Sequence, residues 1–220
     1  MKRREFHVSV FKYSAAALFT PYLRGLAQAS APADLATLYK NAIVIDSLSG
    51  PFVDLGVSPG PKVLAEIKQS GITAVNYTIS ERDFEGTIKN LGLIQALVEK
   101  YPETFTIVRN HSDISRAKRD NRLGIIPGFQ DTTFLEEDPG RIEMFRNLGV
   151  RIMQITYNNR GAFGDGCLEP GNAGLSKAGT LAVKKMNDIG VAVDVSHSGY
   201  RTTEEAISAS SKPVLISHAG

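Results

Sequence analysis

Short apolar, β-branched runs alternate with longer amphipathic patterns along most of this sequence, and this alternation constrains the fold more than any other feature. The strand-like runs occupy residues 41–46, 72–79, 105–110, 123–130, 151–156, 191–197 and 213–218. The helix-like patterns occupy residues 61–69, 84–100, 112–120, 139–148, 176–189 and 202–210. Runs that are apolar throughout are typical of strands buried on both faces. Strands alternating with helices at this spacing predict a parallel sheet joined by right-handed crossovers.

Polar side chains follow several of the predicted strands, and their distribution favours a barrel over an open sheet. They stand at or just past the strand ends: Asp46, Gln130 with Asp131, Tyr157 with Asn158, His197 and His218. An α/β barrel builds its site from the ends of many strands, whereas an open doubly wound sheet concentrates it at one switch point. No glycine-rich phosphate-binding fingerprint follows the first run, which disfavours a dinucleotide-binding sheet. We therefore predict a TIM-type (β/α)8 barrel.

The number of predicted strands is too small for a closed barrel. A complete barrel needs eight strands and about 250 residues. The 220-residue sequence supplies six or seven strands, depending on whether residues 105–110 form a barrel strand or a short connector. We therefore expect residues 32–220 to be the N-terminal part of one α/β-barrel domain whose C-terminal strands are missing.

Residues 1–31 have the layout of an export signal. A positive start is followed by the mostly apolar stretch 8–26 and then by small residues, the order found in cleaved signals. Arg3 and Arg4 precede the aromatic Phe6, as paired arginines do in twin-arginine signals. The sequence thus predicts a periplasmic or secreted protein exported by the twin-arginine route; the alternative is a surface amphipathic helix. No uninterrupted apolar run of about 18–20 residues occurs, so no transmembrane span is predicted.

Composition and charge argue against nucleic acid as a partner. The chain is 42 % hydrophobic and 22 % charged, which is ordinary for a globular protein. Residues 1–31 hold five basic residues and one acidic residue, so the remaining chain is mildly acidic although the net charge is +2. Without a basic stripe, nucleic acid is not an expected partner, and a small-molecule substrate is. The oligomeric state stays open, with a homodimer as one option.

Cys167 is the single cysteine of the sequence, so no internal disulfide can form. It lies in a glycine-rich loop with no base near it in sequence. We therefore interpret Cys167 as structural or incidental rather than as a nucleophile.

Two histidines carry the clearest chemical signal. His197 and His218 end two successive predicted strands and are 21 residues apart, the length of one βα unit. Neighbouring parallel strands would bring their imidazoles together, and neutral imidazole is a common ligand of zinc-like metals. A single histidine at a strand end is more often a satisfied polar residue, but two equivalent placements favour a metal site. The spacing leaves the metal and the reaction open.

Several segments resemble the renal (membrane) dipeptidase family, peptidase family M19. They are GIIPGFQD, GVRIMQITYN, GDGC and the long stretch from NAGLSKAG through DVSH to ISHAG. The resemblance implies an α/β barrel with a two-zinc site and hydrolysis of dipeptides by metal-activated water. The family histidines in the DVSH and ISH contexts ligate one zinc and correspond to His197 and His218. The family's catalytic aspartate would lie in the missing C-terminal part, so the catalytic residue of this chain stays unknown.

The sequence departs from the family pattern at the second metal site. Leu48 and Gly50 stand where a His-x-Asp pair is expected, and Gln130 stands in place of a bridging glutamate. Leucine cannot ligate a cation, and an amide bridges metals poorly. We therefore predict a single Zn²⁺ and loss of the second site, with Gln130 as a metal ligand or a residue supporting one. Tyr157 replaces a substrate-contacting histidine, and with Asn158 it is a candidate for substrate binding or for anchoring the loop 157–175.

Two acidic residues have open roles. Asp46 is either a ligand, or a partner that orients a histidine, or the cap of the following turn. Asp194 precedes His197 by three residues and either faces away from it on the strand or contacts a metal ligand and orients it.

Three functions remain compatible with the sequence. The first is a zinc-dependent hydrolase that cleaves dipeptides or similar small amides. The second is a catalytically impaired barrel that binds a small ligand without turnover. The third is a related hydrolase that opens lactones or cyclic amides.

Overall fold

The computed structural model of the protein describes residues 34–49, 56–136 and 138–219. The chain divides into two units, Met1–Ala42 and Ile43–Gly220. In the first unit, helix α2 (Leu35–Asn41) begins at Asp34, whose side chain caps it; the sequence patterns did not predict this helix. The predicted export signal at 1–31 and Gly50 lie outside the described residues. In the described ranges, no helix has the length and apolar character needed to cross a membrane.

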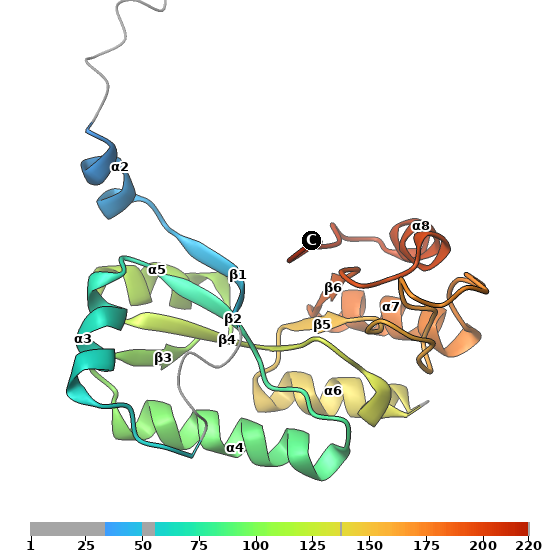
Figure 1. Ribbon diagram of the computed structural model, residues 1–220, viewed down its shortest axis with the longest axis horizontal. Helices are drawn as coiled ribbons and strands as arrows, with labels where there is room; N and C mark the ends of the chain where they lie inside the picture. The colour runs from blue at the N-terminus through green and yellow to red at the C-terminus, as the bar shows by residue number, and fades with distance from the viewer. Residues whose placement is uncertain (1–33, 50–55, 137, 220) are drawn as a thin grey trace, which may run out of the picture. The chain divides into compact units, whose positions relative to one another are not determined.

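The second unit is built on a parallel sheet, which has six strands among the described residues (Figure 1). The strands are β1 (Ile45–Ser49), β2 (Ala74–Thr78), β3 (Phe105–Ile107), β4 (Leu123–Phe129), β5 (Ile152–Gln154) and β6 (Ala192–Asp194). They follow the order β1-β2-β4-β5-β6, and β3 pairs with β4 off this path. The predicted parallel α/β organisation is therefore confirmed.

The short strand β3 settles the alternative left open for residues 105–110. It pairs with Leu123–Ile125 in the first half of β4, whereas β5 pairs with Gly128 and Phe129 in the second half. Because β3 and β5 pair with different halves of β4, β3 is an additional short strand of the sheet, and the main path of the sheet still runs from β4 to β5.

Several strands are shorter than predicted: the run 191–197 forms a strand only at Ala192–Asp194, so His197 lies past the strand and not at its end. Two predicted strands differ more strongly. The first strand was expected at 41–46, but β1 spans Ile45–Ser49, because pairing with β2 continues past the apolar run, through a register shift, to Ser49 opposite Tyr77. Within the described residues, 213–218 contains only an isolated parallel bridge between Leu215 and Asp194.

The helices agree closely with the sequence patterns. They are α3 (Pro61–Gln69), α4 (Phe84–Lys100), α5 (His111–Arg119), α6 (Pro139–Leu148), α7 (Lys177–Ile189) and α8 (Tyr200–Ala209), with a 3-10 turn η1 at Thr133–Leu135. Side-chain caps explain why the starts were predictable: the Ser176 hydroxyl, for example, accepts from the Gly179 amide at 2.9 Å. Gly149 and Gly190 end α6 and α7 with positive φ angles of 119° and 73°, the conformation that favours glycine.

The pleat of the sheet separates an apolar face from a partly polar one. Odd-numbered side chains such as Val75, Ile125 and Met153 belong to the large core that packs against the helices. In β2, β4, β5 and β6, even-numbered side chains point to the other face, where Asn76, Gln154 and Asp194 are all buried. Since partners in parallel register point the same way, the pairing of Gln154 with Asp194 places both on this polar face.

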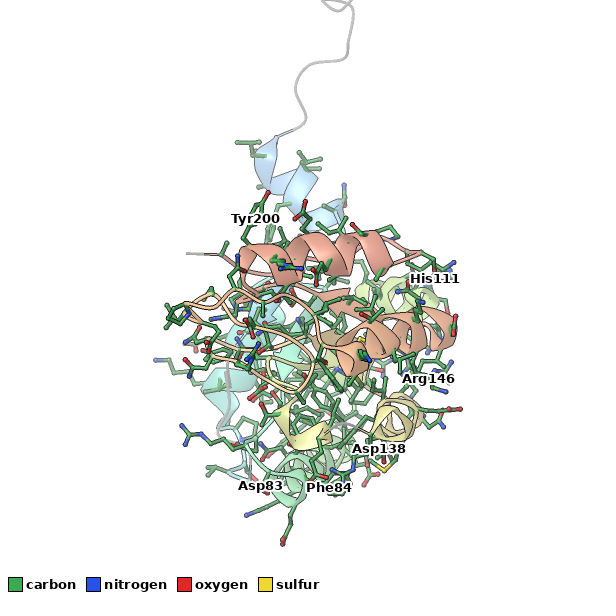
Figure 2. All side chains as sticks on the ribbon, turned by 90° about the vertical axis from the view of Figure 1, so that its right-hand side faces the viewer. Asp83, Phe84, His111, Asp138, Arg146 and Tyr200 are labelled. Carbon is green, nitrogen blue, oxygen red and sulfur yellow. The ribbon has the colours of Figure 1, made fainter. Side chains whose placement is uncertain are left out.

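Aromatic rings join the beginning of α4 and the second half of α6 to the sheet. Phe145 contacts Phe129 and Phe134 edge to face, with ring centroids 5.0 and 5.4 Å apart. The Arg141 guanidinium lies 5.0 Å from the centre of the Phe84 ring. Figure 2 shows Phe84 close to Asp138, the capping residue of α6. This packing holds the helix layer against the sheet.

Candidate metal centre

His197 and His218 lie side by side beyond the carboxyl end of β6. Their ring centroids are 4.8 Å apart and the ring planes are inclined by 57°. Both side chains are half-buried. The remaining described histidine, His111, is exposed at the first residue of α5 (Figure 2). The structure thus brings together the two histidines that the spacing singled out.

The ring of His197 is held by Tyr157 and Asn158, which lie three and four residues past the end of β5. Tyr157 stacks on it with a centroid distance of 4.1 Å and an angle of 26°. The Nδ1 atom lies 2.6 Å from the Asn158 amide oxygen. Because that oxygen only accepts, Nδ1 carries the proton, and Nε2 of the neutral ring keeps its lone pair. Tyr157 and Asn158, predicted to bind substrate or anchor the loop, contact the imidazole here.

The environment of His197 favours its neutral form. Burial lowers the pKa of His197 below its ordinary value of 6.5, and the neighbouring His218 lowers it further, while Asp194 acts in the opposite direction. The ring is therefore neutral near pH 7, which is the form that binds metals.

The backbone of His197 also has an uncommon conformation. Its φ angle is 59°, in the left-handed region that side chains with a Cβ rarely adopt. The His197 carbonyl accepts from the Cys167 amide at 2.6 Å, and the Ser198 amide donates to the Val195 carbonyl. These bonds hold the turn that presents the imidazole.

Both ring nitrogens of His218 lie near polar groups. Its Nδ1 lies 2.9 Å from the Ser217 hydroxyl, and its Nε2 lies 3.4 Å from the Gln130 amide nitrogen. Ser217 in turn donates to a carboxylate oxygen of Asp194. Gln130 therefore turns its nitrogen, not its oxygen, toward the histidine.

The two imidazoles open onto a cavity of about 700 Å³. Asn158, Cys167 and Ser198 also line it. Cys167 is a free, exposed thiol in the glycine-rich loop, and its sulfur lies 3.7 Å from the Asn158 amide oxygen. A small substrate would fit in a cavity of this size.

The donor atoms at this cavity fit part of a zinc site. Within the described ranges, no group of three or more His, Cys, Asp or Glu side chains is placed to hold a metal ion. His197 and His218 can supply two of the four ligands that zinc usually takes. Gln130 could add its amide oxygen only after a rotation of the amide group.

Asp46 is not brought to the histidines. Its register partner is Val75, whose side chain belongs to the core beneath the helices. Asp46 therefore faces a separate cavity that includes Glu66 and Ile67 of α3. One of its carboxylate oxygens accepts from the Leu48 amide at 3.2 Å, so the structure favours the turn-capping alternative.

Two buried aspartates contribute contacts around the site; a supporting role was one of two alternatives for Asp194, whereas no role was predicted for Asp165. Asp194 bonds to Ser196 and Ser217, and so reaches the segment that carries His218. Asp165 is 1 % exposed and accepts from Arg160 and from the Ala173 amide, which orders the loop 157–175. The serine preceding each histidine was the available signal for the first network, and the GDGC segment was the available signal for Asp165.

Comparison with known proteins places this chain in a family. A profile described as membrane dipeptidase (peptidase family M19) matches residues 64–220. The chain belongs to the membrane dipeptidase family. Dipeptidase verJ of Clonostachys rogersoniana is 29 % identical over 134 residues, which cover 60 % of this chain and 34 % of that protein.

Solved structures support the fold of this membrane dipeptidase family member. An amidohydrolase from Pseudomonas aeruginosa is 35 % identical with a TM-score of 0.77, and the likeness covers 84 % of this chain and 55 % of that one. The probable dipeptidase PvdM of the same organism is 19 % identical with a TM-score of 0.76, over 84 % of this chain and 54 % of that one. The described sheet corresponds to a curled half-barrel, so the predicted incomplete TIM-type fold is confirmed. The chain spans about a third of the curated dipeptidase and about half of the solved structures.

Proposed function

We propose that His197 and His218 bind one zinc ion and that the protein hydrolyses dipeptides or similar small amides at this ion. The observation that carries the proposal is the pair of imidazoles with ring centroids 4.8 Å apart, which share one cavity. Membership of the membrane dipeptidase family supports the same chemistry.

The residues of this chain would prepare the site for the ion. Asn158 keeps the His197 proton on Nδ1, and burial keeps the ring neutral. Tyr157 stacks on the ring and restricts its rotation. A divalent cation held by the two rings would polarise a scissile carbonyl and lower the pKa of a water molecule.

The residues at the second family site support a single ion. Leu48 has no donor atom, and Gln130 presents an amide nitrogen toward His218. An N–H donor cannot ligate a cation. These observations also favour the second candidate function, a barrel that binds a small ligand without turnover.

Turnover by the protein, purified as its host makes it, separates the two functions. We expect saturable hydrolysis of some members of a dipeptide panel, loss of activity with a chelator, and recovery with zinc. A His218→Ala variant should lose zinc-dependent turnover because one of two imidazole ligands is removed. Saturable binding of dipeptides with no hydrolysis at any zinc concentration would instead identify the ligand-binding barrel.

Export is a separate proposal. We propose that residues 1–31 direct the protein across the cytoplasmic membrane by the twin-arginine route, on the strength of Arg3, Arg4 and the apolar stretch that follows. An Arg3→Lys, Arg4→Lys variant should accumulate in the cytoplasm with its N-terminus uncleaved. Unchanged cleavage and periplasmic recovery would contradict this route.

A further inference from the structure

We propose that Asp194 is a positioning residue that acts through Ser217 to hold the His218 proton on Nδ1, leaving Nε2 free as a ligand. The value of a free Nε2 rests on the proposed metal function. The position of the proton, however, follows from contacts that need no metal.

The two carboxylate oxygens of Asp194 have different surroundings. Asp194 is 2 % exposed at the end of β6. Its Oδ1 accepts from the Ser196 amide at 2.9 Å, the Ser196 hydroxyl at 2.7 Å and the Ser217 amide at 3.3 Å. Its Oδ2 accepts from the Ser217 hydroxyl. Oδ1 thus accepts from two backbone amides and the Ser196 hydroxyl, whereas Oδ2 accepts from the Ser217 hydroxyl.

This arrangement fixes the direction of the next hydrogen bond. A serine hydroxyl has one proton, and a carboxylate only accepts. Since Ser217 gives its proton to Asp194, its oxygen has only lone pairs to offer His218, whose Nδ1 lies 2.9 Å away. The proton between Ser217 and His218 therefore belongs to the imidazole. In the neutral ring, Nε2 is then unprotonated.

Gln130 supports the same assignment from the other side of the ring. Its amide nitrogen lies 3.4 Å from His218 Nε2. An amide nitrogen donates and does not accept, so Nε2 must contribute a lone pair to this contact. Asp194, Ser217 and Gln130 therefore all favour one tautomer of His218.

The unequal surroundings of Asp194 make a sharp test possible. In Asp194→Asn, the two backbone amides should retain the carbonyl oxygen at the Oδ1 position, because both must donate. The new amide nitrogen then occupies the Oδ2 position and donates to Ser217. Ser217 would then donate its own proton to His218 Nδ1, and the ring would carry its proton on Nε2, with the Gln130 amide rotated so that its oxygen faces that nitrogen. The nearly isosteric substitution Asp194→Asn is thus expected to exchange donor and acceptor in each hydrogen bond from residue 194 through Ser217 to His218.

The measurement is nitrogen NMR of the metal-free protein labelled with ¹⁵N-histidine. His218→Gln identifies the His218 signals, and His197 is the internal control because Asn158 sets its tautomer. We expect Nδ1–H on His218 in the unmodified protein and in Ser217→Thr, which keeps the hydroxyl. We expect Nε2–H in Asp194→Asn and loss of the Nδ1–H preference in Ser217→Ala, with the His197 signals unchanged throughout.

The results decide the proposal independently of metal binding. Nε2–H on His218 in the unmodified protein would overturn it, as would an Nδ1–H preference that survives Ser217→Ala. If Asp194→Asn does not fold, Ser217→Ala decides alone, since it removes a single oxygen. As a separate measurement, Co²⁺ affinity should fall about 10–100-fold in Asp194→Asn and be retained in Ser217→Thr. A reversed tautomer with no Co²⁺ binding in any variant would support the positioning role and contradict the metal function.

Discussion

At the scale of single residues, His197 combines a rare backbone conformation with a half-buried, neutral imidazole. A φ angle of 59° costs free energy for a residue with a Cβ. The Cys167 and Asn158 contacts hold this conformation. Backbone strain of this kind persists where surrounding contacts fix the conformation, and strained residues cluster at functional sites.

Comparison of two substitutions measures the backbone cost at His197. His197→Ala and His197→Gly both remove the imidazole, but only glycine adopts the left-handed conformation freely. We expect the glycine variant to be more stable than the alanine variant by about 1 kcal/mol in urea unfolding. At Leu181, exposed within α7, the order should reverse by about 1 kcal/mol. Equal stabilities of the two His197 variants would show that the turn carries no strain.

Gly128 is required by the polar face of the sheet. A Cβ added to Gly128 would overlap the Asn76 amide oxygen, and both residues lie in the sheet interior. Gly128→Ala should therefore destabilise the fold by about 1–3 kcal/mol. Gly92→Ala in α4, where a Cβ meets nothing within 4 Å, should stabilise it by about 0.5–1 kcal/mol.

A double substitution identifies the cause of the Gly128 effect. In an Asn76→Ala background the obstructing amide is absent, so the loss caused by Gly128→Ala should become much smaller. Chemical unfolding of the four proteins gives the coupling free energy between the two sites. If the losses of stability caused by Asn76→Ala and Gly128→Ala are additive, the Asn76 side chain is not what the new Cβ collides with.

At the scale of elements, α8 anchors the loop that forms one wall of the histidine cavity. The Glu205 carboxylate accepts from the Leu175 amide at 2.8 Å and from Arg201 Nε at 2.7 Å. The hydrogen bond from Arg201 and then that from Leu175 lower the pKa of Glu205 below its ordinary value of 4.5. The ionised side chain thus fastens the loop 157–175 to a helix.

The pH dependence of stability tests this anchor. Because the pKa is lowered in the folded state, the contribution of Glu205 is complete above the unfolded-state value. It is lost as the pH falls from about 4.5 through the lower folded-state value. We expect the stability difference between the unmodified protein and Glu205→Gln to be constant near neutrality and to close in acid. A difference that stays constant to the lowest pH at which the protein folds would show that the carboxylate charge is not involved.

The elements also show which parts of the fold the sequence could predict. Helices α4 and α6 have the predicted bounds, because local caps and apolar periodicity determine them. Pairing of β1 with β2 extends beyond the apolar run of β1 to Ser49, since it depends on the neighbouring strand as well as on local composition. Residues 213–218 have strand-like composition but only one bridge, because pairing depends on neighbours that local composition does not specify.

The candidate site was predictable to a similar degree. The spacing of His197 and His218 predicted that the two rings would be neighbours, as the structure shows. The face occupied by Asp46 and the contacts of Asp194 depend on strand register and on segments distant in sequence. Periodicity does not reveal such contacts, so the hydrogen-bond network around His218 required the structure.

At the scale of the whole molecule, the histidine pair is the place where the proposed hydrolysis would occur. The membrane dipeptidase family profile covers residues 64–220, including every residue proposed to touch the ion. A ligand that binds only the folded state also raises its stability. Zinc binding by the histidine pair would therefore raise the free energy of unfolding of the entire protein.

The most direct test is equilibrium dialysis of the purified protein against zinc, compared with a His197→Ala, His218→Ala double variant. We predict that the unmodified protein retains a single zinc ion per chain and that the double variant retains none at the same free zinc concentration. Circular dichroism of both proteins checks that the fold is kept. Equal zinc content in two folded proteins would contradict the assignment of this pair as the metal centre.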